Sequence, residues 1–125
     1  MIYTGVIIEE SLGDKTVLSE VVVVKTKISP VTHEDKTPWL KQWTLHTVEI
    51  APNKADAVAQ KISKSFDPVH PDWYADYRNN LFHYIIFPNK IFRVDLQNPV
   101  FYKEARSHGI SIGIPEYQVN FEGSV

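Results

Sequence analysis

The chain of 125 residues contains no cysteine. Without cysteine it forms no disulfide and offers no thiolate metal ligand or cysteine nucleophile, so these three kinds of site are excluded. An excess of charge is also missing, since 13 basic residues stand against 15 acidic ones for a net charge of −2. Proteins that bind nucleic acid usually show a basic face or tail. The composition therefore predicts no nucleic-acid partner and does not favour a small RNA-cleaving toxin.

Long apolar segments are absent as well. The longest purely aliphatic run is Val21–Val24, which is far shorter than the roughly 20 residues that span a bilayer. No basic segment precedes Glu9 and Glu10, in contrast to a secretory signal. We therefore expect a cytoplasmic protein with no membrane partner. Hydrophobic residues make up 43% and charged residues 22%, as in folded chains, and no repeat or linker divides the sequence. Residues 1–125 are expected to form a single domain.

Segments rich in β-branched residues predict strands in the first half of the chain. Residues 2–10 and 16–28 are two such segments, and the Gly and Asp between them favour a β-hairpin. A third strand is predicted over residues 40–50, after a polar segment bracketed by prolines. Alternation within the second strand predicts one buried face, formed by Leu18, Val22, Val24 and Ile28.

The second half of the chain shows helical and strand signals in turn. Apolar residues recur at helical spacing over 54–66, and the Asp-Pro pair that follows ends this helix. Residues 81–87 and 90–96 predict a second hairpin. An Asn-Pro pair then predicts the start of a helix over 100–108. A short last strand is expected at 117–121.

From residue 40 onward the predicted order is β-α-β-β-α-β, the order of ferredoxin-like folds, with a hairpin before it. We predict an α+β fold with a mostly antiparallel sheet and two main helices on one face. A cystatin-like curved sheet wrapped on one helix is the alternative. Because helices on one face leave the other face bare, we expect a homodimer.

Residues 109–113 read GISIG, which matches the G-x-S-x-G pattern of serine hydrolases. That pattern needs a strand before the serine and a helix after it, with the acid and the histidine later in the chain. Here a helix precedes Ser111 and no histidine follows it. We therefore interpret the match as coincidence. Gly109 is expected to end the helix in the left-handed conformation.

Metal-ligand patterns are weak. None of the five histidines belongs to an HExxH motif. Residues 32–35 and the segment from His70 to Asp72 each offer only two ligands, and a catalytic metal needs a third from elsewhere. The sequence thus predicts no metal site and no cofactor.

Aromatic side chains concentrate in residues 67–87, which hold six of the chain's 15 aromatic residues. If a short helix begins at Pro71, Trp73 and Tyr77 lie on one of its faces. Aromatic walls with a few polar groups are typical of ligand pockets, although aromatic residues also serve to anchor a long connection. We expect Trp73 itself to pack and a ligand to bind beside it. The candidate binding residues are Trp43, His46, Trp73, Tyr74, Tyr77 and Arg78.

Two functions follow from these residues. The first is a non-enzymatic ligand-binding or regulatory module, favoured because no nucleophile set, phosphate loop or metal set is present. The alternative is an acid–base enzyme that acts on a small anionic substrate. In that case His83 or His70 is the general base, Asp72 or Asp76 orients it, and Arg78 binds the anion. The enzyme requires these side chains to converge in one concave site.

Overall fold

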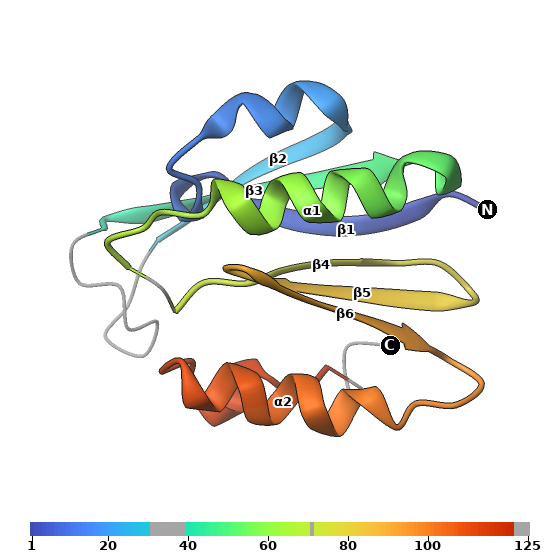
Figure 1. Ribbon diagram of the computed structural model, residues 1–125. Coiled ribbons are helices and arrows are strands. Elements are labelled where there is room, and N and C mark those ends of the chain that lie inside the picture. Colours follow the sequence, from blue (N-terminus) through green and yellow to red (C-terminus); the bar gives the residue numbers. More distant parts are fainter. Residues whose placement is uncertain (31–39, 71, 122–125) are drawn as a thin grey trace.

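The computed structural model describes residues 1–30, 40–70 and 72–121 and shows an α+β fold (Figure 1). Six strands form one sheet in the order β2-β3-β1-β4-β5-β6, and every neighbouring pair is antiparallel. The strands are β1 (Tyr3–Ile8), β2 (Val22–Pro30), β3 (Gln42–Ile50), β4 (Ala75–Arg78), β5 (Phe82–Phe87) and β6 (Lys90–Asp95). The α-helices of the described residues are α1 (Ala55–Ser65) and α2 (Phe101–Ser111). Residues 32–35, one of the two weak metal-ligand patterns of the sequence, lie outside the described residues.

The two helices cover opposite faces of the sheet. Tyr84 and Ile86 of β5 belong to the hydrophobic cluster that contains the buried side of α1. Ile85 and Phe87, which alternate with them, belong to the cluster that contains Tyr102 of α2. Because successive strand residues point to opposite faces, α1 and α2 lie on different sides. In Figure 1 the strands β4, β5 and β6 lie between α1 and α2. The prediction of both helices on one face is therefore wrong.

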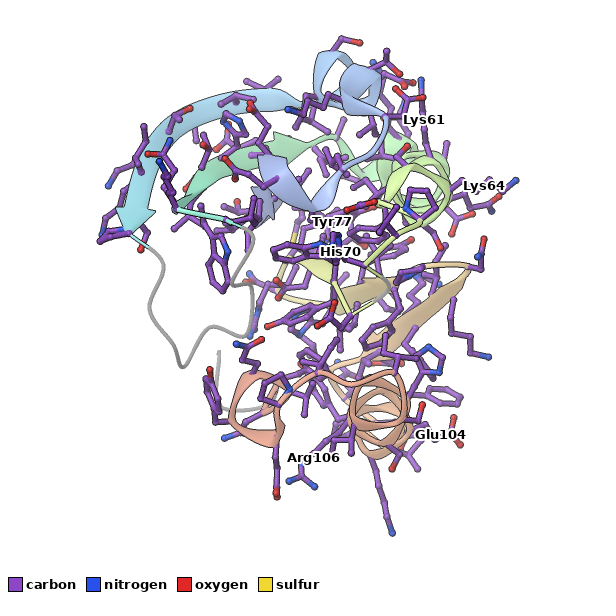
Figure 2. All side chains as sticks on the ribbon, turned by 90° about the vertical axis from the view of Figure 1, so that its left-hand side faces the viewer. Lys61, Lys64, His70, Tyr77, Glu104 and Arg106 are labelled. Carbon is purple, nitrogen blue, oxygen red and sulfur yellow. The ribbon has the colours of Figure 1, made fainter. Side chains whose placement is uncertain are left out.

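Helix α1 packs as its apolar spacing predicts. Val58, Ala59 and Ile62 are buried against the sheet, whereas Lys61 and Lys64 lie on the solvent side (Figure 2). The buried Tyr77 of β4 donates a hydrogen bond to the carbonyl of Ala55. Burial raises the pKa of Tyr77, so the phenol keeps its proton and remains a donor.

Helix α2 continues past the residue where its end was predicted. Gly109 is helical and buried, and Gly113 is the glycine with a left-handed backbone, at φ 100°. A Cβ on Gly109 would lie 2.7 Å from a side-chain carbon of Val119, so close packing explains this glycine. The left-handed role predicted for Gly109 is wrong. Ser111 is exposed, and its hydroxyl donates a hydrogen bond to the carbonyl of His108 at 2.6 Å.

His108 of α2 packs against two rings of the core, with centroid distances of 4.8 Å to Phe87 and 5.9 Å to Phe92. Within the described residues its Nε2 atom is buried and has no hydrogen-bond partner. Desolvation, and then the charge of Lys90, lower the pKa of His108 from its ordinary value of 6.5. The folded protein therefore favours the neutral imidazole.

Acidification should destabilise the protein partly through His108. The unfolded chain takes up the proton near pH 6.5 and the folded chain only at lower pH, so this contribution to stability is lost as the pH falls below 6.5. The pKa values of Glu9 and Asp67 are also lowered, from ordinary values of 4.5 and 3.8. Their contributions to stability are therefore lost only when the pH falls below about these ordinary values. Urea midpoints measured at pH 7 and about pH 5.5 should differ less in His108→Phe than in the wild type. An equal difference in both proteins would exclude this role for His108.

The sheet order differs from the predicted one in its N-terminal part. β1 does not form a hairpin with β2, because β1 pairs with β3 on one side and with β4 on the other. The unit β3-α1-β4 is thus a split crossover with β1 inserted in the middle, and the ferredoxin-like order is not confirmed.

The helix considered after Pro71 is also wrong, since Ala75–Arg78 forms β4. Residues 116–118 form a 3₁₀ turn in place of the expected last strand, and two α-helices exclude the single-helix alternative.

Strand β2 lies at the edge of the sheet and is almost wholly exposed. Val22 and Ile28 keep 61% and 58% of their surface exposed, so the predicted buried face of this strand is wrong. The register shifts between Val23 and Lys25, and such a bulge interrupts the alternation on which that prediction depended.

Within the described ranges, no helix is long and apolar enough to cross a membrane.

Candidate functional site

A cavity of about 550 Å³ lies on the face of the sheet opposite α1. Its floor is formed by Val6 and Ile8 of β1 and Leu45 of β3. These residues alternate with Ile7 and Val48, which pack under α1. Because α2 covers only the β5–β6 half of this face, the central strands β1 and β3 remain accessible. The volume is in the range typical of small-molecule pockets.

Aromatic side chains form the walls of the cavity. Trp43 and Trp73 meet edge to face with ring centroids 5.8 Å apart. On the other wall Tyr74 and Phe121 meet in the same way at 5.2 Å. Tyr117 also contributes to the lining. Aromatic pairs of this geometry present both ring faces and ring edges to a ligand.

A hydrogen bond that Tyr74, the residue before β4, donates to the carbonyl of Gln118 at 2.8 Å connects the C-terminal segment to the start of β4. Burial raises the pKa of Tyr74, so its phenol stays protonated and keeps this donor. The contact places Gln118 and Asn120 beside the cavity as additional polar lining.

The acidic groups of the lining are Asp72 and Asp76. Oδ2 of Asp76 lies 2.7 Å from Nε2 of His83, and Nδ1 of His83 lies 2.7 Å from the hydroxyl of Tyr102. A carboxylate only accepts, so the N–H group at Nε2 donates a hydrogen bond to Asp76. If Nδ1 carries no hydrogen, it accepts a hydrogen bond from the hydroxyl of Tyr102. This chain of hydrogen bonds holds Asp76 in one orientation at the cavity wall.

His83 and Asp76 differ in how far their side chains are buried. The side chain of His83 is 0% exposed, whereas that of Asp76 is 29% exposed and lines the cavity. A ligand in the cavity therefore meets the carboxylate and not the imidazole. The sequence-based hypothesis made His83 the base and Asp76 its orienting group. In the structure Asp76 is the side chain that a ligand can reach, and His83 lies behind it.

The other predicted site residues divide into two groups. Trp43, Trp73, Tyr74 and Asp72 line the cavity together with Asp76. Trp73 is at the same time 5% exposed and part of the core, in agreement with the packing expected for it. Outside the cavity lining lie Tyr77, Arg78, His46 and His70.

His46 and His70 each bind a carboxylate elsewhere. Nε2 of His46 lies 3.0 Å from Glu9, and its Nδ1 lies 2.9 Å from the hydroxyl of Thr26. His46 pairs with Ile7 and so shares the α1 face of the sheet, away from the cavity. His70 lies 2.7 Å from Asp67. Neither histidine therefore meets Asp76, and the structure does not bring all four catalytic candidates together.

Several residues of the cavity lining were not predicted as site residues from the sequence. Val6, Ile8 and Leu45 belong to predicted strands, and their alternation with buried neighbours was the signal available for them. Tyr117, Gln118, Asn120 and Phe121 gave no comparable signal, because their position depends on the 3₁₀ turn and on the bond from Tyr74. Tyr102 was assigned only to a helix, and its bond to His83 crosses from α2 to β5.

No family model, curated protein or solved structure significantly matches this chain. In the part of the chain that the structure describes, no three histidine or acidic residues are grouped so that they could hold a metal ion.

Proposed function

We propose that the protein is a small ligand-binding module whose site is the cavity between the open face of the sheet and the C-terminal segment. The observation that carries the proposal is the cavity of about 550 Å³ with aromatic walls and one acidic group held by buried partners. Pockets that bind small molecules combine an apolar lining with a few oriented polar groups in this way.

Binding is favoured over acid–base catalysis by the set of polar groups at the cavity. Proton transfer in both directions requires groups of suitable pKa that reach the same substrate atoms. Among the described lining residues the ionisable groups other than tyrosine are Asp72 and Asp76, and neither histidine nor arginine joins them. In the enzyme alternative Asp76 would be the base and His83 a positioning residue. An anionic substrate fits poorly, because Arg78 lies outside the lining.

The homodimer expected from the sequence remains part of the proposal. The support for it is the exposed edge strand β2, since unpaired strand edges are surfaces at which chains associate.

Ligand binding is testable by nuclear magnetic resonance with a library of small fragments. Fragments that bind should shift the amide signals of Val6, Leu45 and Tyr74 most strongly, because these residues line the cavity. Signals of α1 should move little, since the sheet separates that helix from the cavity. If the shifts concentrate on the α1 side, or if no fragment produces any, the proposed site is wrong.

A further inference from the structure

We infer that the cavity selects an organic cation, such as a substituted ammonium group. This inference rests on the proposed function, because it specifies the chemical class of ligand that the same cavity binds. It follows from three properties of the lining: its charge, its aromatic walls and the fixed position of Asp76.

The charge of the lining has one sign. Asp72 and Asp76 contribute two carboxylates, and no lysine or arginine belongs to the described lining. On the same face, the basic residues at neighbouring positions include Arg78, two residues after Asp76, Lys27, which pairs with Leu45, and Lys25, which pairs with Thr47 beside Val6. All three lie outside the lining. A cation in the cavity gains Coulomb energy from the two carboxylates, whereas an anion is repelled by them.

The aromatic walls suit the same ligand. A cation within about 6 Å of an aromatic ring is attracted by the negative potential of the ring face, and tryptophan is the strongest partner. Two tryptophans, two tyrosines and one phenylalanine line the cavity, namely Trp43, Trp73, Tyr74, Tyr117 and Phe121. Such rings also exclude water, which strengthens the interaction with the carboxylates.

The position of Asp76 is fixed before any ligand binds. His83 donates to Oδ2 and is itself fixed by Tyr102. The carboxylate keeps lone pairs beyond the one that accepts from His83, and 29% of the side chain is exposed at the cavity. Since little side-chain freedom is lost on binding, the charge pair forms at low entropic cost.

The test uses three probes of one shape and different charge: choline, its neutral carbon isostere 3,3-dimethylbutan-1-ol, and the anion 3,3-dimethylbutanoate. Titrations followed by the indole N–H signals should give choline a Kd of about 1 mM or lower. The neutral isostere should bind roughly tenfold or more weakly, and the anion more weakly still.

Variants assign the effect to the lining. Asp76→Asn retains the acceptor for His83 but loses the charge, and it should weaken choline binding by roughly tenfold. Asp72→Asn should weaken it in the same direction. Glu104→Gln removes an exposed charge from the solvent side of α2 (Figure 2) and should leave the affinity unchanged. Thermal melts of each variant report whether it is folded.

The outcomes separate this inference from the proposed function. If the alcohol binds in the cavity as tightly as choline, and Asp76→Asn has no effect on choline, the cation inference is wrong and the binding site stands. If choline binds but Glu104→Gln weakens it as much as Asp76→Asn does, attraction by the overall charge explains the result and the inference is also wrong. If none of the three probes nor any fragment shifts a cavity signal, the proposed function itself fails.

Discussion

Replacement of Gly5 by alanine is expected to destabilise the protein by about 3 kcal/mol or more, because the added methyl group has no room. Gly5 lies in the middle of β1 and pairs with Val48 on one side and Tyr77 on the other. A Cβ at this position would lie 2.0 Å from the carbonyl oxygen of Asp76 and 2.6 Å from Cα of Tyr77. Both atoms belong to the backbone, so the overlap is relieved only if β1 and β4 separate.

Urea unfolding of Gly5→Ala, compared with the wild type, measures this cost. Thr4→Ala is the matched control, since Thr4 is exposed on the same strand, and it should change stability by no more than about 0.5 kcal/mol. Equal midpoints for Gly5→Ala and the wild type would mean that β1 does not lie between β3 and β4 as described.

His83→Ala is expected to lower the free energy of unfolding by about 3 kcal/mol, the second large effect. The imidazole is fully buried and joins the hydroxyl of Tyr102 to the carboxylate of Asp76. Alanine leaves a cavity and removes the partner of both groups. Tyr102→Phe deletes only one hydroxyl and should cost about 1 kcal/mol.

Denaturant unfolding also checks this prediction, and His70→Ala is the control. His70 pairs with Asp67 in a partly exposed segment, where such pairs contribute between about 0 and 1 kcal/mol. A cost of His83→Ala no larger than that of His70→Ala would show that the buried chain of hydrogen bonds does not stabilise the fold.

The elements with strong local signals were predictable from the sequence. The apolar spacing over 54–66 corresponds to α1 (Ala55–Ser65), and the hairpin at 81–96 corresponds to β5 and β6. In these segments periodicity, turn residues and burial agree with one another. The α+β class followed from them.

The arrangement of the sheet was not predictable in the same way. The insertion of β1 between β3 and β4 depends on pairings between residues 37 or more positions apart, such as Tyr3 with Ile50. Residues 16–20 carry β-branched side chains but form a 3₁₀ turn that packs on α1, because Val17 is buried there. Local composition does not determine secondary structure that depends on tertiary packing of this kind.

The site was predictable in part. Aromatic enrichment marked the segment that contains Trp73, Tyr74 and Asp76, and β4 with the two residues before it places these side chains at the cavity. Asp76 and His83 meet because the β4–β5 register sets them diagonally on one face. Both residues were candidates from the sequence, but their burial depends on α2 and the C-terminal segment. This burial determines which of the two side chains a ligand reaches.

The most direct test of the binding site compares two valine-to-phenylalanine variants in the fragment titration described above. Val6→Phe places a ring on the floor of the cavity, whereas Val22→Phe adds the same ring to the exposed edge of β2. The cavity account predicts that Val6→Phe abolishes the fragment-induced shifts of Leu45 and Tyr74 and that Val22→Phe preserves them. Undiminished shifts in Val6→Phe, with the fold intact by its thermal melt, would contradict the assignment of ligand binding to this cavity.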